Sequence, residues 1–281
     1  MTHAGLSAQT TYHVVLTWSD QSDRMECWLN GEVEVAEGIA WDMEDHRAPF
    51  DLHTVGMNAW GCAAGEVWMP TNSDVPSTNL RGWIDEVAVW DRVLSAGEIA
   101  SHYDSGSVAC YTATPTATPT SSPTATPTPG VCGYQATVAG DGPLHHWTLD
   151  SYVEDPNSGV RFFADAGSGE NASMASLVPD AVVGEPSLVG EGYGVGCDTD
   201  VAGETCMALP STSDMHTCWT SGGCEEVTYE AWFKASELSG TQAVLMIGAK
   251  EAGFGVYLED EVLWCGAWSG RLVAPGAATV G

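Results

Sequence analysis

Residues 82–99 read GWIDEVAVWDRVLSAGEI and carry the strongest structural signal in this sequence. Alternation along 82–90 predicts a strand with Trp83, Asp85, Val87 and Val89 on one face and Ile84, Glu86, Ala88 and Trp90 on the other. Neither face is wholly polar, which predicts burial on both sides. A short helix is expected over 94–103, because Ser95 and Glu98 have the spacing of a capping box.

Upstream of this stretch the sequence predicts further strands. HVVLTW at 13–18 is a compact β run, and MECWL at 25–29 follows a polar turn. Asn30-Gly31 is a strong signal for a two-residue hairpin, with its second strand over 32–36. Another strand is expected over 51–57.

Downstream, residues 112–129 read TATPTATPTSSPTATPTP and contain only Thr, Ala, Ser and Pro. This composition cannot build a core and favours polyproline II, so the linker 110–132 divides the chain into segments 1–109 and 133–281. Hydroxyls beside proline are typical of an O-glycosylated stalk, and a bare spacer is the alternative. The candidate glycosylated residues are Thr112, Thr114, Thr116, Thr118, Thr120, Ser121, Ser122, Thr124, Thr126 and Thr128.

The second segment is also rich in strand patterns. GPLHHWTLD begins at Gly142 and predicts an opening strand, followed by the polar loop 165–171. VTYEAWFK at 227–234 predicts a strand with Val227, Tyr229, Ala231 and Phe233 on one face and Trp232 on the other. The runs 242–248, 254–258 and 262–268 form a plausible meander. The whole chain is therefore expected to be all-β.

These motifs resemble laminin-G-like domains of the concanavalin A-like superfamily, which are antiparallel jelly-roll β-sandwiches. GWIDEVAVWDRVLSAGEI is similar to the end of that domain, and VTYEAWFK is similar to a strand in its middle. The two segments are complementary: 1–109 resembles the C-terminal half and 133–281 the N-terminal half. The halves therefore stand in permuted order.

Three arrangements follow from this order. The halves can close on each other within one chain, because jelly-roll termini lie close together and long loops close at little extra cost. Alternatively, the C-terminal half in one chain can complete the N-terminal half in the next chain. Neighbouring copies would then join head to tail into a filament. The chain can also be an excerpt of a tandem array. The N-terminal residues lack the features of a signal peptide, which suggests a piece of a longer secreted protein.

Charge and composition limit the partners. The net charge is −30, from 38 acidic and 8 basic residues, which argues against nucleic acid and anionic membrane. The sequence contains no run of about 20 apolar residues, so no membrane span is predicted. Nine cysteines without a CxxC pair indicate disulfides in an oxidising, extracellular compartment rather than a zinc site. Local pairs are expected between Cys197 and Cys206 and between Cys218 and Cys224, and Cys110 with Cys132 could close the linker into a loop.

The resemblance implies a possible calcium site. In this superfamily an aspartate at the position of Asp85 and loop carboxylates near the first strand can hold calcium. The loop candidates are Asp150, Asp165 and Glu170. The alternative is that Asp85 hydrogen-bonds a neighbouring loop. His145 and His146 are expected to point to opposite faces of a strand, so they cannot easily share a metal.

Catalysis is not expected. Some concanavalin-like folds are glycosidases with paired carboxylates on one strand face, but Glu259-Asp260-Glu261 lacks that alternation and predicts a hairpin turn. Nor does a GxSxG motif occur. The resemblance implies a recognition or adhesion module that binds a glycan or an extracellular protein. The candidate binding residues are aromatic, because exposed indole rings stack on sugars and anchor interfaces: Trp60, Trp68, Trp219 and Trp268.

Overall fold

The computed structural model describes thirteen ranges of the chain: 3–19, 21–22, 24–38, 52–55, 80–107, 133–157, 161–167, 171–174, 183–189, 192–197, 207–209, 226–249 and 252–269. The expected linker falls outside them. No helix within these ranges is long and apolar enough to cross a lipid bilayer.

Before the linker, the described ranges contain strands and one helix: β1 (His3–Ala4), β2 (Thr11–Ser19), β3 (Arg24–Leu29), β4 (Glu32–Gly38), β5 (Leu52–Val55), β6 (Gly82–Trp90) and α1 (Ala96–Ser107). The segment after it begins with a helix and continues in strands: α2 (Gly133–Gly140), β7 (His145–Trp147), β8 (Tyr152–Glu154), β9 (Arg161–Ala164), β10 (Asn171–Met174), β11 (Val183–Pro186), β12 (Tyr193–Gly196), β13 (Met207–Leu209), β14 (Glu226–Ala235), β15 (Thr241–Ala249), β16 (Ala252–Glu259) and β17 (Val262–Ser269).

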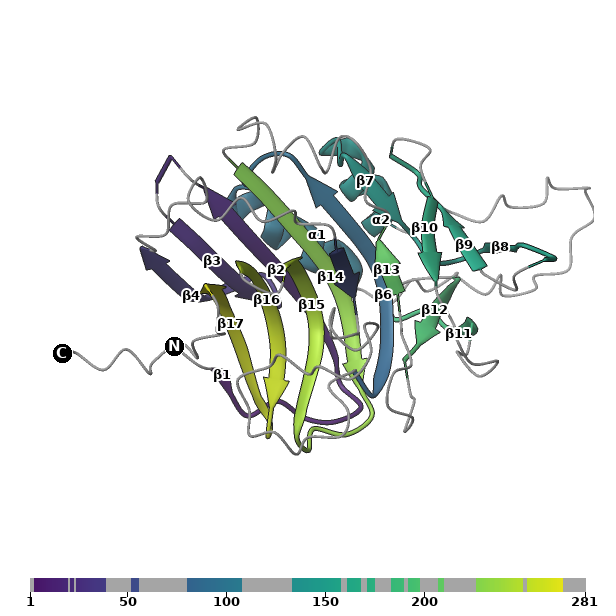
Figure 1. The fold of residues 1–281 in the computed structure, drawn as a ribbon. Coiled ribbons are helices and arrows are strands. Elements are labelled where there is room, and N and C mark those ends of the chain that lie inside the picture. The colour runs from purple at the N-terminus through teal and green to yellow at the C-terminus, as the bar shows by residue number, and fades with distance from the viewer. Residues whose placement is uncertain are drawn as a thin grey trace, which may run out of the picture.

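These strands form two antiparallel sheets, which confirms the all-β sandwich (Figure 1). Sheet A has the order β1-β17-β16-β15-β5-β13-β10-β9-β8. Sheet B has the order β11-β12-β6-β14-β2-β3-β4, and β7 also pairs with β6.

Both sheets contain strands from both segments of the chain. β14 of the second segment lies between β2 and β6 of the first, paired antiparallel with each along most of its length. In sheet A, β5 is likewise flanked by β13 and β15, and β1 pairs with β17. Neither segment therefore holds a complete sheet by itself in this structure.

The main core lies between the sheets. The predicted shared face of VTYEAWFK is confirmed, and it points inward, because Val227, Tyr229, Ala231 and Phe233 all belong to this core. Trp232 lies on the opposite face of β14, in a second apolar cluster. Most tryptophans on the described strands are buried: Trp18, Trp28, Trp90, Trp147 and Trp232. Trp83 and Trp264 are half-buried.

Local turn and cap signals are also confirmed. Asn30 and Gly31 both adopt positive φ, of 52° and 79°, at the turn between β3 and β4, as a type I′ hairpin requires. Asp260 and Glu261 form the turn between β16 and β17. At the start of α1, Ser95 N–H donates to Glu98 Oε2 at 2.7 Å and Glu98 N–H donates to Ser95 Oγ at 3.3 Å, which is the predicted capping box.

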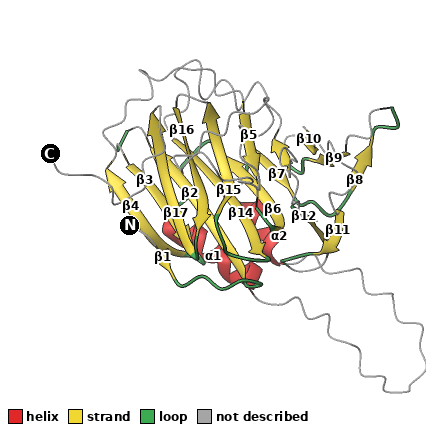
Figure 2. Cartoon of the chain, turned by 60° about the horizontal axis from the view of Figure 1, so that its bottom comes forward, coloured by secondary structure: helices red, strands yellow, loops and turns green. Residues whose placement is uncertain are grey.

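Two helices form a third layer on the outer face of sheet B (Figure 2). α1 buries Ile99 and His102, and α2 buries Tyr134 and Val138. Beneath them lie apolar side chains of the strands: Val15, Trp28, Ala88, Trp90 and Trp232. No helix was predicted at the position of α2, whereas the position of α1 agrees with the expected helix.

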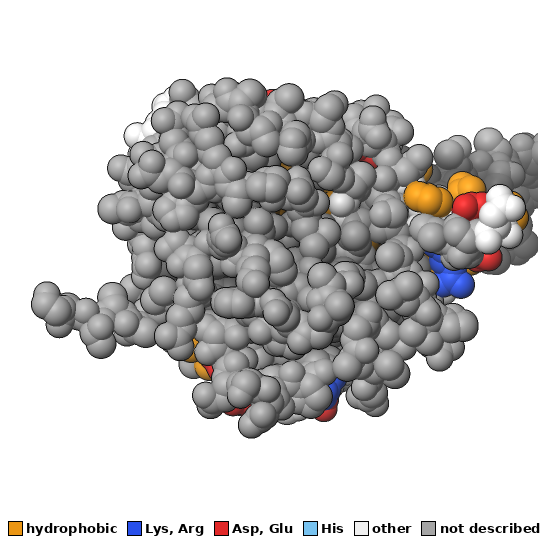
Figure 3. Space-filling model, viewed as in Figure 1, with side chains coloured by type: hydrophobic (Ala, Val, Ile, Leu, Met, Phe, Trp, Pro, Cys, Tyr) orange, Lys and Arg blue, Asp and Glu red, His pale blue; other side chains and the backbone are white. Residues whose placement is uncertain are grey.

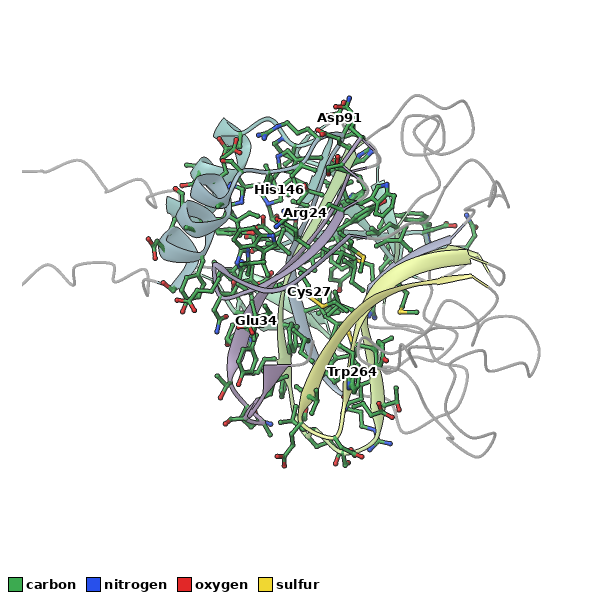
Figure 4. All side chains as sticks on the ribbon, turned by 90° about the vertical axis from the view of Figure 1, so that its left-hand side faces the viewer. Arg24, Cys27, Glu34, Asp91, His146 and Trp264 are labelled. Atoms are coloured by element: carbon green, nitrogen blue, oxygen red, sulfur yellow. A yellow bond between two sulfur atoms is a disulfide. The ribbon has the colours of Figure 1, made fainter. Side chains whose placement is uncertain are left out.

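A disulfide between Cys27 on β3 and Cys265 on β17 crosses the core from one sheet to the other (Figure 4). The two residues are 238 positions apart, and each belongs to a different segment. This bridge was not among the pairs expected from the sequence. It fits a protein that folds in an oxidising compartment.

Candidate functional site

A bulge in β6 shapes the outer face of sheet B. Glu86 has φ of 50°, and the register against β14 shifts between Glu230 and Trp232. Ile84, Val87 and Val89 therefore point into the main core, while Ala88 and Trp90 join the outer cluster. The predicted strict alternation over 82–90 is wrong at this point, because a bulge inserts an extra residue and places Asp85 and Glu86 on the same outer side.

Asp85 is buried and binds a neighbouring loop. Its Oδ2 accepts hydrogen bonds from Ser187 Oγ at 2.6 Å and from the Leu188 backbone N–H at 2.8 Å. Oδ1 accepts one from the Glu86 N–H at 3.0 Å. Burial raises the pKa of Asp85 well above its ordinary value, and the charge of Glu86 adds to the rise. The alternative predicted for Asp85, an anchor for a neighbouring loop, matches these contacts.

Gln135 of α2 joins the second carboxylate of the bulge to Asp150. Its Nε2 donates to Glu86 Oε1 at 2.7 Å and to Asp150 Oδ2 at 3.0 Å. His146 Nε2 lies 2.7 Å from Glu86 Oε2, and burial still leaves the pKa of Glu86 raised. Asp150 Oδ1 accepts from the Tyr193 N–H at 3.0 Å.

The two adjacent histidines point apart, as predicted. His145 Nδ1 lies 2.5 Å from Asp165 Oδ2, whereas His146 contacts Glu86. Asp165 Oδ1 also accepts from the backbone N–H groups of His146 and Gly167, at 2.9 Å and 2.7 Å. Each histidine therefore binds its own carboxylate.

Three of the four carboxylates predicted to hold calcium lie within the described residues, where each contacts other protein groups. Asp85 and Asp150 approach each other near the bulge, Asp165 binds His145, and Glu170 lies outside the described residues. The oxygens of the first three accept hydrogen bonds from protein N–H and O–H groups, whereas calcium needs about 6–8 oxygen ligands of its own. Within the described ranges, no group of three or more His, Cys, Asp or Glu side chains is arranged to hold a metal. Calcium binding stays a prediction of the resemblance, which calorimetric titration with calcium chloride tests.

Replacing Asp85 with alanine is expected to lower the free energy of unfolding by about 1–3 kcal/mol, because the Ser187 and Leu188 donors lose their buried acceptor. Urea denaturation measures the change. Asp104→Ala, at an exposed position on α1, is the matched control and should change little. Equal stability of the two variants would contradict the anchoring role of Asp85.

A second polar network lies under the helices, around the buried carboxylate of Glu230 on β14. His102 of α1 places Nδ1 2.8 Å from Glu230 Oε2, and Tyr134 of α2 donates from its hydroxyl to Oε1 at 2.5 Å. His13 of β2 places Nε2 2.9 Å from Oε1. The second nitrogen of His102 lies 2.9 Å from Asp141 Oδ2, at the end of α2.

These contacts shift the ionisation of the network. Burial disfavours the charged form of Glu230, but the charge of His13 and the contacts with His102 outweigh it and hold the pKa well below its ordinary value. Burial likewise lowers the pKa of His102, but Glu230 and Asp141 outweigh it and leave the pKa raised. Burial and the charge of Glu230 raise the pKa of Tyr134. The network is therefore a charged one, in which the buried Glu230 carboxylate faces His102, His13 and the Tyr134 hydroxyl.

The two ends of the linker leave the domain at one place. A Cβ added to Gly133, the first residue of α2, would lie 3.9 Å from the Cβ of Ser105 in the last turn of α1. A Cβ on Gly106 would come within 2.4 Å of Trp232 and 3.0 Å of Tyr134, so only glycine allows this close approach. Residues 108–132 thus connect two points that are close together.

The remaining predicted residues fall mostly outside the described ranges. Trp60, Trp68 and Trp219 lie outside them, as do all the candidate glycosylated residues and five of the predicted cysteines: Cys110, Cys132, Cys206, Cys218 and Cys224. Trp268 lies on β17. Cys197 is disulfide-bonded, and its predicted partner Cys206 remains a prediction.

Sequence reasoning did not find the Glu230 network. Glu230 and His13 each occur within a predicted strand, and His102 within a predicted helix, but nothing in their spacing links them. A usable signal was present, because a charged residue in the middle of the otherwise apolar VTYEAWFK strand requires a buried partner.

The fold and these contacts define an all-β sandwich that carries two helices and two buried carboxylate-histidine networks. No protein-family model, curated protein or solved structure matches the chain.

Proposed function

We propose that this chain is a non-catalytic, extracellular recognition module of the laminin-G-like kind, and that it binds a glycan or a protein. The proposal rests on the resemblance of its strand motifs, and the two-sheet sandwich and the Cys27–Cys265 disulfide agree with it.

The structural observation that supports a binding role is a set of exposed aromatic and apolar side chains at one end of the sandwich. Tyr152 on β8 is 44% exposed, Tyr193 on β12 is 52% exposed and Val153 is 72% exposed. The backbone N–H of Tyr193, at the start of β12, binds Asp150, which lies two residues before Tyr152 at the start of β8. The guanidinium of Arg161 lies 5.3 Å from the centre of the Tyr152 ring.

This end of the molecule projects from the sandwich. Figure 3 shows hydrophobic, basic and acidic side chains together where Figure 1 places β8 and β9. Aromatic rings beside a guanidinium suit stacking on sugar rings and contacts with a protein partner.

Alanine substitution tests this surface. Tyr152→Ala and Tyr193→Ala are each expected to weaken binding of the ligand found on a glycan array or in a binding screen by about tenfold or more, as for a central aromatic contact. Val33→Ala, an apolar position that is 48% exposed on β4 at the other edge of sheet B, is the matched control. Unchanged affinity in both tyrosine variants would overturn the assignment of the surface.

The second candidate function is head-to-tail assembly between copies. The strands of the two segments interlock in both sheets, and the same contacts could join two chains. The closeness of the two linker ends supports closure within one chain instead. Light scattering over a dilution series separates these two arrangements, because only the assembly loses mass on dilution.

A further inference from the structure

We propose that a single proton on His102 clamps the two linker-bearing helices to sheet B, and that losing this proton releases them. The clamp consists of His13, His102, Tyr134, Asp141 and Glu230, which come from β2, α1, α2, the residue after α2, and β14. It goes beyond the recognition function, because it controls how the linker ends are held.

The geometry of His102 requires the proton. Both ring nitrogens face carboxylate oxygens, Nδ1 at 2.8 Å from Glu230 and Nε2 at 2.9 Å from Asp141. Carboxylates only accept hydrogen bonds, and a neutral imidazole has a single N–H. Both contacts are therefore hydrogen bonds only when the ring is an imidazolium. Deprotonation would place a nitrogen lone pair against one of the two carboxylates.

The contacts of this one ring connect the whole layer. His102 belongs to α1, Glu230 to the central strand of sheet B, and Asp141 ends α2, where its N–H binds the carbonyl oxygens of Thr137 and Val138. Tyr134 adds a hydroxyl from α2 to the same Glu230 carboxylate. Removing the charge of His102 weakens the attachment of both helices at once.

The other groups described around His102 do not replace the bridge that its ring makes between Glu230 and Asp141. Trp90 of β6 stacks on His102 at 5.5 Å between ring centres, and Trp232 lies 4.7 Å from the ring of His13. Glu86 of β6 adds negative charge near Tyr134. Arg92 donates to the backbone carbonyl of Asp141 at 3.0 Å, but its guanidinium is also paired with Glu98. His13 is buried beside Oε1 of Glu230, whereas His102 lies at Oε2 and is also the ring that faces Asp141.

Water can reach the clamp from one side. The side chains of His13, His102 and Glu230 are fully buried, whereas that of Asp141 is 28% exposed. Proton exchange through Asp141 therefore does not require the sheet to open. Release would uncover the apolar side chains under the helices, including Trp90 and Trp232.

The direction of the pH dependence follows from the two shifts. The pKa of His102 is raised, so its contribution to stability is complete below the ordinary value of 6.5 and is lost as the pH rises through the raised value. The pKa of Glu230 is lowered, so its contribution is present above 4.5 and is lost only as the pH falls through the lowered value. The clamp is therefore intact at pH values between the lowered pKa of Glu230 and the raised pKa of His102. It opens when the pH rises above the pKa of His102.

Hydrogen exchange of the full chain, corrected for the intrinsic effect of pH, tests the proposal. In the wild type we expect protection of 96–107 and 133–140 to fall at alkaline pH, with a red shift of tryptophan emission, while β15–β17 stay protected. His102→Gln is expected to leave the helices unprotected at every pH. His145→Gln removes a buried histidine that binds Asp165 instead, and it should retain the wild-type profile of the helices.

A second variant keeps the test decisive if His102→Gln does not fold. Asp141→Asn removes one carboxylate beside His102 at a partly exposed position, so the alkaline midpoint should move down by about one pH unit. A midpoint that stays unchanged in Asp141→Asn, or helices that remain protected in the wild type throughout the alkaline range, would overturn the clamp.

Discussion

Cutting the Thr/Pro-rich linker is expected to leave the two segments bound to each other as one folded particle. A protease site placed between Ser121 and Ser122 would separate residues 1–121 from 122–281 without touching either sheet. β14 would still pair with β2 from Ser19 to Thr11 and with β6 from Trp90 to Gly82. Size-exclusion chromatography with light scattering should therefore give the intact monomer mass after complete cleavage.

Gel electrophoresis and chromatography under reducing and non-reducing conditions show whether the disulfide or the strand pairing holds the fragments together. Under denaturing, non-reducing conditions the fragments should remain one band, because Cys27 and Cys265 lie on opposite sides of the cut. Adding reductant should give two bands, whereas under native conditions the reduced fragments should still elute together. Separation of the native fragments would contradict a sandwich completed within one chain. Large species that dissolve after cleavage would instead indicate completion between chains.

Removing the Cys27–Cys265 bridge is expected to lower the free energy of unfolding by about 2–5 kcal/mol. The bridge closes a loop of 238 residues, so its absence allows the unfolded chain many more conformations. The variant Cys27→Ala/Cys265→Ala is preferable to serine, because both positions lie in the apolar core and a serine hydroxyl there would need a partner. Urea denaturation under oxidising conditions measures the change.

Reductant provides the matched control. In reductant, the free energy of unfolding of the wild type should fall at least to that of the oxidised double variant. Any further fall when the double variant is itself reduced reports the remaining disulfides, including that of Cys197. The cleaved double variant also tests the predicted Cys110–Cys132 pair, because only a second bridge across the cut would hold its fragments together on a non-reducing gel. A double variant as stable as the wild type would show that the bridge adds little.

The parts of the fold that depend on neighbouring residues were predictable. Asn30-Gly31 makes its own hairpin because both residues tolerate positive φ. Ser95 and Glu98 satisfy each other's backbone groups at the start of α1, and this requires no distant partner. The two faces of 227–234 follow from the period of an extended strand.

The parts that depend on distant partners were not predictable. The bulge at Glu86 forms because β6 pairs with β14, and the two strands are separated by about 140 residues of chain. GYQATVAG has little preference for a helix of its own, and α2 forms where Tyr134 and Val138 are buried against the layer beneath. Glu230 acquires its partners only when three other elements pack around it.

The sequence by itself determined the all-β class, the turns and the cap, because short-range backbone geometry and side-chain period fix them. Only the tertiary structure decided that strands of both segments share each sheet, that Cys27 meets Cys265, and that His102 lies between two carboxylates. These features depend on contacts between residues 39, 128 and 238 positions apart, and local propensities carry no information about which distant residues meet.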